Sequence, residues 1–219
     1  MSVKMKVFKS RDEWLKARKI YIGGSDAACV VGLNPYKSNV DLWKIKTGRE
    51  IQEDISGKPL VKYGTNAEKY LRELFKLDFP QFEVGYEENN IFLNDRFPFA
   101  HASLDGWLTD KGTGEKGILE IKTSNIASSA QSEKWKDKIP DNYYCQVLHY
   151  LMVTEFDFAI VKAQLKYQYS ADDIFLKTRH YRIDRADVEE DINFLENSEK
   201  EFYNYIKQDI EPSLILPQI

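Results

Sequence analysis

The chain has 219 residues, a formal net charge of −4 and a hydrophobic fraction of 42%. These values suit an ordinary buried core, and we expect one α/β domain over residues 1–219. The acidic balance argues against a broad basic surface, although local Lys and Arg residues can still contact phosphate. No stretch reaches the roughly 18 to 20 apolar residues of a membrane span, and no signal-peptide core opens the chain, so we expect a soluble, intracellular protein with no membrane partner.

The first third of the chain predicts short helices joined by turns. Ser10 is expected to cap the first helix. After the Gly23-Gly24 turn, either Ser25 or Asp26 can cap a second short helix. An Asn-Pro pair then breaks the chain before a third helix that begins near Val40.

The middle of the chain changes from helical to strand periodicity. Apolar residues at helical spacing predict a helix over residues 62–77, which carries Glu68. Alternation from residue 82 to residue 121 predicts a β-meander. A glycine-rich turn separates Asp105 from Glu120, so we expect these acids on adjacent strands with their ends side by side.

The last third predicts a buried helix, two strands and a closing helix. The helix after Pro140 is apolar nearly all round and is therefore expected to be buried. Residues 156–165 and 178–183 predict strands, with a loop at residues 169–173 between them. Mixed charges and apolar residues predict an amphipathic helix from about residue 187 to residue 207.

The cysteines and histidines are isolated in the sequence. Cys29 and Cys145 lie far apart and outside any CxxC spacing, so they supply neither a disulfide framework nor a four-cysteine metal site. His101, His149 and His180 are too dispersed for a zinc triad. We expect packed, reduced thiols and structural histidines.

Two carboxylates and an amine form the most informative motif. Side chains alternate faces along a strand, so Glu120 and Lys122 share one face while Leu119 and Ile121 point into the opposite layer. Phosphodiester hydrolysis needs hard oxygen ligands for a divalent metal and a group that orients or deprotonates water, which Asp105, Glu120 and Lys122 could supply. The spacing alone is more often explained by the solvent-facing side of an amphipathic strand, with Asp105 and Gly106 in a turn.

Other short segments form an ordered set around this motif. They are residues 22–28 (IGGSDAA), 32–36 (GLNPY), 41–43 (DLW), 63–68 (YGTNAE), 102–106 (ASLDG), 119–122 (LEIK) and 143–147 (YYCQV). In this order they resemble the YqaJ-type viral recombinases, the lambda exonuclease branch of the PD-(D/E)xK nucleases. The resemblance runs from about Trp14 to Thr154 and implies a restriction-endonuclease-like α/β fold, with a central mixed β-sheet flanked by α-helices.

The resemblance also implies a metal site. Asp105 and Glu120 match the residues that ligate two Mg²⁺ ions in the family, with Mn²⁺ as a substitute. The backbone carbonyl of Ile121 is expected to contribute a further oxygen. Lys122 matches the residue that assists the nucleophilic water, and its pKa is expected to be lowered by the nearby cation.

Two further residues are expected to complete this site. Glu68 and Gln146 match a helical Glu and a Gln that lie near the metals and water in the family. The alternatives are a surface charge for Glu68 and a buried amide satisfied by backbone for Gln146. Leu104 and Leu148 depart from the family pattern, in which Pro and a second Gln are usual, and neither departure removes the acids or the amine.

The 5′-phosphate site of the family is only partly present. Lambda-type exonucleases hold this phosphate with a Ser in the glycine-rich segment and an Arg seven residues before it, and Arg18 stands seven residues before Ser25. A further Arg is expected soon after the LEIK strand and is missing from residues 124–132. The nearest cations there are Lys134, Lys136 and Lys138.

Leu60 and Val61 stand where the family presents an apolar wedge that separates the strand end. Ordinary packing of two apolar residues explains them equally well. The resemblance is therefore the sole reason to expect strand separation at this position.

The function implied by the resemblance is a Mg²⁺-dependent 5′→3′ exonuclease. It would resect linear double-stranded DNA and leave 3′ single-stranded tails for a single-strand annealing protein, as in phage-type homologous recombination. A homotrimer that encircles the DNA and a phage or prophage protein in the cytoplasm of a bacterial host are also implied.

Two rival functions remain open on the sequence. A structure-specific DNA endonuclease could use the same fold, and a catalytically silent DNA-binding module could keep the fold without the chemistry. The joint presence of both acids and the amine argues against a silent module. The cysteine count argues against a Cas4-like iron–sulfur nuclease.

Overall fold

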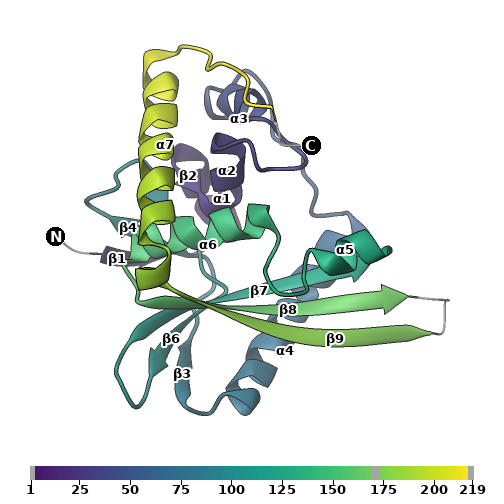
Figure 1. Ribbon diagram of the computed structural model, residues 1–219. Coiled ribbons are helices and arrows are strands. Elements are labelled where there is room, and N and C mark those ends of the chain that lie inside the picture. The colour runs from purple at the N-terminus through teal and green to yellow at the C-terminus, as the bar shows by residue number, and fades with distance from the viewer. Residues whose placement is uncertain (1–2, 169–172, 217–219) are drawn as a thin grey trace.

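The computed structural model describes residues 3–168 and 173–216. Its centre is a five-stranded sheet in the order β3-β6-β7-β8-β9 (Figure 1). The β7–β8 pair is parallel and the other three pairs are antiparallel, which confirms the expected mixed sheet. The strands are β3 (Phe82–Gly85), β6 (Gly106–Asp110), β7 (Lys116–Ile126), β8 (Phe158–Gln168) and β9 (Ile174–Asp184).

Helices cover both faces of this sheet, as expected. Helix α4 (Pro59–Asp78) lies on one face, below the sheet in Figure 1, and α6 (Asp141–Thr154) lies on the other. Beyond α6 come α2 (Gly24–Val30) and α7 (Glu189–Gln208). The remaining helices are α1 (Arg11–Ile20), α3 (Asn39–Lys46), α5 (Ser129–Glu133) and the 3₁₀ turn η1 (Arg185–Asp187). Among the helices of the described ranges, none is long and apolar enough to cross a membrane.

The predicted meander is wrong, because two of its strands pair elsewhere. Strand β4 (Asn90–Asn94) pairs with β1 (Val3–Val7), and β5 (Ala100–His101) pairs with β2 (Ile22–Gly23). Alternation identifies a strand but not its partner, which is chosen by contacts distant in sequence. Strand β1 was not predicted, although its valine and methionine residues alternate with lysines.

The helix starts show which capping predictions hold. The Ser10 hydroxyl accepts the Glu13 N–H at 3.3 Å, which confirms Ser10 as the cap of α1. The cap of α2 is Gly23, so the prediction of Ser25 or Asp26 is wrong. Asp26 is the third residue of this helix, and its carboxylate accepts the Gly23 N–H at 3.1 Å. The first residues of the loop predicted at 169–173 lie outside the described residues.

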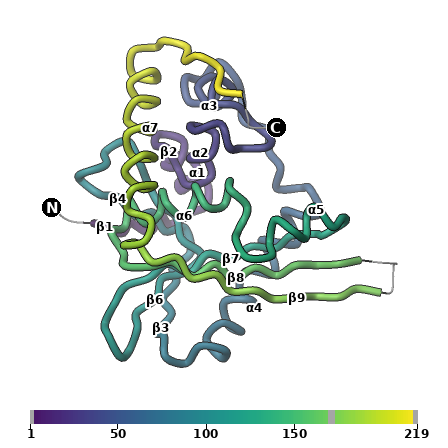
Figure 2. Tube along the Cα trace, viewed as in Figure 1, coloured from purple at the N-terminus to yellow at the C-terminus, as the bar shows by residue number. Residues whose placement is uncertain are grey.

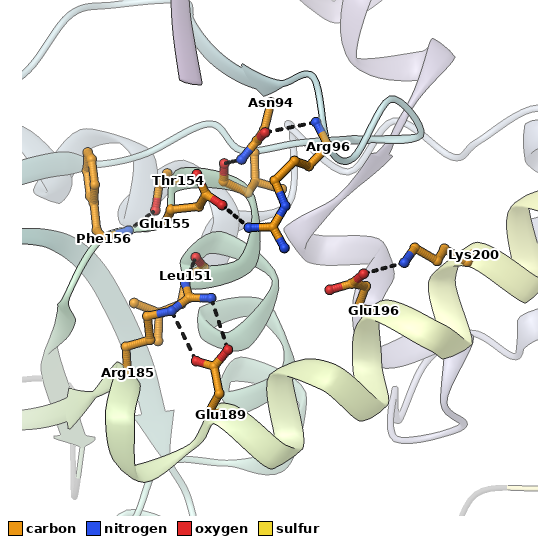
Figure 3. A network of polar contacts seen from close by, with 11 residues as sticks. Asn94, Arg96, Leu151, Thr154, Glu155, Phe156, Arg185, Glu189, Glu196 and Lys200 are labelled. Carbon is orange, nitrogen blue, oxygen red and sulfur yellow. Dashed lines mark hydrogen bonds and ion pairs between the residues drawn. The ribbon is translucent and has the colours of Figure 1, made fainter. Parts of the chain in front are cut away.

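Side chains from other elements fix the carboxyl-terminal end of α6 (Figure 3). Glu155 takes a positive φ of 56° and ends the helix. Carbonyls in the last turn of a helix have no partner inside it. Here the Arg185 guanidinium donates to the Leu151 carbonyl at 2.5 Å, and the Asn94 amide donates to the Val153 carbonyl at 3.0 Å. Helix α6, which carries Gln146, is therefore held from both β4 and η1.

The two ends of the described chain lie far apart in the fold (Figure 2). The carboxyl-terminal segment runs against α3, where the Asn39 side chain donates to the Ser213 carbonyl at 2.8 Å and accepts the Ile215 N–H at 3.0 Å. The β8–β9 pair extends beyond the other strands of the sheet in Figure 2. Near the far end of β9, the side chains of Ile174, Phe175 and Leu176 are exposed.

Candidate active site

The candidate acids gather where the β6–β7 ladder ends. The last antiparallel pair is Gly106 opposite Leu119. Immediately beyond it, the Asp105 carboxylate accepts the Ile121 N–H at 2.8 Å and so takes the place of a strand partner. Asp105 and Glu120 therefore lie at neighbouring strand ends, as the sequence predicted.

Glu120, Lys122 and Gln146 form a closed set of contacts. The Lys122 amine lies 2.6 Å from Glu120 Oε1 and donates to Gln146 Oε1 at 2.9 Å. The Gln146 Nε2 group donates to the same Glu120 oxygen at 2.9 Å and to the Tyr150 hydroxyl at 2.9 Å. The structure thus brings a β7 acid, a β7 amine and an α6 amide into one network.

The burial of Glu120 argues against the alternative explanation, in which this side of the strand faces solvent. Glu120 is only 2% exposed, so it does not lie on a solvated face. Leu119 and Ile121 point to the opposite layer and pack with Leu71 and Phe75 of α4. The predicted division of the strand into two faces is confirmed.

Glu68 reaches the same site from α4, through a residue that the sequence did not single out. The Arg72 Nη1 group donates to Glu68 Oε1 at 3.0 Å and to the Asp105 backbone carbonyl at 2.6 Å. The guanidinium also lies over the Tyr86 ring, 3.4 Å from its centroid. The available signal was the four-residue spacing of Glu68 and Arg72, which places the two on one helix face.

A buried amide fixes the segment that leads into Asp105. Asn90 is 3% exposed, accepts the Leu104 N–H at 2.9 Å and donates to the Leu104 carbonyl at 2.9 Å. The Trp14 indole donates to the Asn90 carbonyl at 3.0 Å and to the Ser103 hydroxyl at 3.2 Å. Asn90 is the first residue of β4 and gave no sequence signal for this role.

The electrostatics follow from burial of several like charges. Burial, with the repulsion of Asp105, raises the pKa of Glu120 to about 8. Burial and the same repulsion raise the pKa of Glu68 to about 7, and burial raises the pKa of Asp105. Burial by itself lowers the pKa of Lys122, but the Glu120 and Asp105 carboxylates outweigh it and raise this pKa. The lowering expected from a neighbouring cation concerns the metal-bound site and stays a prediction.

The residues present fit a hard divalent cation with few protein ligands. The Glu120 Oε2 atom is buried and has no hydrogen-bond partner among the described residues. Within these same residues, no three His, Cys, Asp or Glu side chains are placed to hold a metal ion by themselves. Mg²⁺ commonly takes one or two carboxylates and keeps several waters, whereas structural Zn²⁺ takes four protein ligands. Asp105 and Glu120 therefore suit Mg²⁺ better than Zn²⁺.

A cavity of about 920 Å³ opens onto this network. Its lining includes Glu68, Asp105, Glu120, Lys122 and Gln146, the five residues predicted to carry catalysis. A cavity of this volume can admit a nucleotide-sized ligand. All five predicted residues are thus available to one bound molecule.

The residues predicted to bind the 5′-phosphate are less clearly assembled. Arg18 lines the cavity, and its guanidinium lies 4.2 Å from the Trp14 ring centroid. Ser25 is exposed as the second residue of α2 and is not among the residues that line the cavity in the described chain. The cations Lys134, Lys136 and Lys138 are exposed and also lie outside that lining.

The predicted wedge residues lie at the start of α4. Leu60 is 59% exposed and Val61 is half-buried. Neither residue lines the cavity as the described residues form it. Their exposure leaves room for a role at a DNA end, and that role stays a prediction.

The histidines and cysteines lie apart from this network. His149 is buried between the Glu199 carboxylate, at 2.7 Å, and the His101 carbonyl, at 2.8 Å. His180 packs edge-on against Phe79. Cys29 and Cys145 are both free and buried, as expected. These contacts support the structural roles predicted for them.

The sequence of the chain was compared with known families and proteins. Residues 13–157 match the model of the YqaJ-like viral recombinase domain. The uncharacterized protein YqaJ of Bacillus subtilis strain 168 is 34% identical over 145 residues, which cover 66% of this chain and 42% of that protein. The chain belongs to the YqaJ-like viral recombinase family. This membership confirms the family predicted from the motifs. The matched region spans less than half of the Bacillus subtilis relative.

Solved structures share the fold. An alkaline exonuclease from Laribacter hongkongensis, LHK-Exo, has a TM-score of 0.64 at 18% identity, with 91% of this chain and 94% of that chain covered. A structure of LHK-Exo in complex with dAMP gives a TM-score of 0.63 at 18% identity and the same coverage. A phage related exonuclease from Haemophilus somnus 129PT has a TM-score of 0.54 at 14% identity, with 89% and 98% covered. At these identities the likeness establishes the fold of the YqaJ-like chain.

Proposed function

We propose that this YqaJ-like protein is a Mg²⁺-dependent 5′→3′ exonuclease that resects linear double-stranded DNA. The observation that carries the proposal is the buried Glu120–Lys122–Gln146 network beside Asp105, open to a cavity of about 920 Å³. Family membership and a fold shared with two proteins named as exonucleases support it.

The acids of the chain bind the metal in this proposal. Asp105 and Glu120 supply carboxylate oxygens, the Ile121 carbonyl supplies a further oxygen, and Glu68 lies close enough to influence the same cation. When bound, Mg²⁺ neutralises phosphate charge and makes water easier to deprotonate. The unpartnered Glu120 Oε2 atom would gain a partner in this arrangement.

The amine and the amide orient the reacting groups. The Lys122 amine lies between Glu120 and Gln146 and can donate a hydrogen bond toward water or phosphate. Gln146 holds Lys122 through Oε1 and Glu120 through Nε2, which fixes both relative to β7. Because Glu120, Lys122 and Gln146 all contact one another, the position of each side chain depends on the other two.

The products fit a recombination pathway. Digestion from 5′ ends leaves 3′ single-stranded tails, which a single-strand annealing protein can pair with a complementary strand. We expect the protein to act in the cytoplasm of a bacterial host, as a phage or prophage product. The family membership supports this setting.

The first test is digestion of a 5′-phosphorylated linear duplex with Mg²⁺. We expect strand loss from 5′ ends, loss of this activity on chelation, and a decrease of at least about 10²-fold for Glu120→Gln, as is typical when a catalytic electrostatic group is removed. Glu133→Gln, at an exposed glutamate of α5, serves as the matched control.

Three results would contradict this proposal. Activity that survives Glu120→Gln would exclude the site, and digestion from 3′ ends would exclude the polarity. Cleavage of covalently closed or branched DNA at internal positions would instead indicate a structure-specific endonuclease.

A second test concerns the choice of DNA end. We expect Arg18 and Ser25 to bind the terminal phosphate, so 5′-phosphorylated ends should be degraded faster than 5′-hydroxyl ends. Arg18→Gln should reduce this preference about tenfold or more, since a hydrogen bond to a charged group contributes about 1.5–3 kcal/mol. Lys19→Gln, the exposed neighbour of Arg18 on α1, is the control. Equal rates on both ends with the unsubstituted protein would remove the phosphate assignment.

A further inference from the structure

Arg72 is a buried cation that joins three separate segments of the chain. It is 4% exposed and lies on α4. Its Nη1 group donates to Glu68 Oε1 at 3.0 Å and to the Asp105 carbonyl at 2.6 Å, while the guanidinium plane lies over Tyr86. The contacts link α4, the segment after β3 and the segment that leads into β6.

These contacts offset the free-energy cost of burying the Arg72 guanidinium. A buried charge requires partners, and a planar guanidinium can donate to acceptors at its edge while its face stacks on an aromatic ring. Glu68 supplies the charge and Asp105 supplies a backbone oxygen. A lysine amine has three N–H donors but no plane to stack on Tyr86, so it could not reproduce all three contacts.

The same contacts set the relative placement of two acids. Glu68 lies on a helix and Asp105 on a segment between strands, and the two are 37 positions apart in the sequence. Arg72 bonds the carboxylate of Glu68 and the backbone of Asp105 through one nitrogen. The Asp105 side chain is fixed in turn by the Ile121 N–H.

We propose that Arg72 is a positioning residue, which holds Glu68 and Asp105 in the one arrangement that receives a divalent cation. The inference rests on the proposed nuclease function for its catalytic consequence, but its effect on metal binding can be measured separately. Arg72 itself need not touch the cation or the DNA. Its loss should therefore weaken metal binding and turnover without a matching loss of DNA affinity.

The experiment compares Arg72→Gln, Arg72→Lys and the control Lys62→Gln with the unsubstituted protein. Lys62 is an exposed lysine of α4 that does not line the cavity. Mn²⁺ binding is measured by isothermal titration calorimetry. The values of kcat and KM are measured on linear duplex DNA, and the thermal midpoint is measured by circular dichroism. We expect Arg72→Gln to weaken Mn²⁺ binding and lower kcat about 10- to 100-fold, as for other residues that orient metal ligands, with KM nearly unchanged.

A double-mutant cycle with Glu68→Gln tests how Arg72 acts. If Arg72 works by positioning Glu68, the fold-loss of Mn²⁺ affinity in the double variant should be clearly smaller than the product of the fold-losses in the two single variants. Losses that multiply in full would overturn the proposal, and so would Mn²⁺ binding by Arg72→Gln equal to that of the unsubstituted protein.

Arg72→Lys keeps the test decisive if Arg72→Gln does not fold. Weaker Mn²⁺ binding by a folded Arg72→Lys supports the proposal, and unchanged binding overturns it. If the unsubstituted protein does not degrade DNA, the proposed function fails, while the calorimetric comparison still decides the role of Arg72.

Discussion

At the scale of single residues, burial changes the meaning of the Asp105, Glu120 and Lys122 motif. Many exposed strands alternate acids and amines, so the spacing alone is ambiguous. A carboxylate that is 2% exposed is costly unless its oxygens are satisfied. One oxygen of Glu120 is held by Lys122 and Gln146, and the other has no partner among the described residues. In the proposed function, this oxygen is a ligand of the divalent cation.

A second buried charge pair predicts how stability depends on pH. Burial lowers the pKa of His149, but the Glu199 carboxylate and the His101 carbonyl outweigh it, so the pKa lies above its ordinary value of about 6.5. A raised pKa in the folded state stabilises the fold at pH below the ordinary value. This contribution is then lost as the pH rises through the pKa of the folded state.

We therefore expect the unfolding free energy to lose the His149 contribution above about pH 6.5. In Glu199→Gln the change over this pH range should be smaller, because the partner that favours the imidazolium is gone. Urea denaturation at a series of pH values measures the difference between the two proteins. Identical pH profiles would show that His149 is neutral in the fold.

At the scale of elements, the start of α2 packs directly against α6. A Cβ placed on Gly24 would lie 2.4 Å from Tyr150 Cε1 and 3.0 Å from Gln146 Cγ. The sequence explained the glycine pair as a turn, whereas the structure shows that Gly24 is needed for close approach to the residues that hold Gln146. The packing of α2 thereby influences the candidate site.

Gly24→Ala should consequently destabilise the protein by about 1–3 kcal/mol, the usual cost of overpacking a close contact. It should also lower nuclease activity, since relief of the clash moves Tyr150 or Gln146. Gly57→Ala is the control, because a Cβ there meets nothing within 4 Å. Equal thermal midpoints and rates for the two variants would contradict this account of Gly24.

At the scale of the whole molecule, the β8–β9 pair leaves apolar side chains uncovered. Ile174 is 47% exposed, Phe175 53% and Leu176 48%. Exposed apolar groups on a long strand pair favour association with another chain. The homotrimer that the family resemblance implies would give these side chains a place to be buried, and it stays a prediction.

We expect sedimentation equilibrium to give three times the chain mass of 25.6 kDa. Burial of apolar surface between subunits should make this assembly persist in high salt, which screens only the charged contacts. A mass equal to one chain across the micromolar range would exclude the trimer.

The sequence by itself determined the parts of this protein that depend on local pattern and on motif identity. Helical periodicity located α4, α6 and α7 within a few residues, and alternation divided β7 into two faces. The ordered motifs determined the family and, through it, the mixed sheet and the set of candidate site residues. The organisation as one domain over residues 1–219 stays a prediction.

Only the tertiary structure decided which strands pair and which side chains meet. The pairing of β1 with β4, the burial of Glu120, and the contacts of Arg72, Asn90 and Gly24 all join residues distant in sequence. Local pattern reports the conformation and the exposed face of a segment, but not the segment that will cover it. The partner is chosen by burial of the whole chain at once. For that reason the acids, Lys122 and Gln146 were predicted, whereas the roles of Arg72, Asn90 and Gly24 were not.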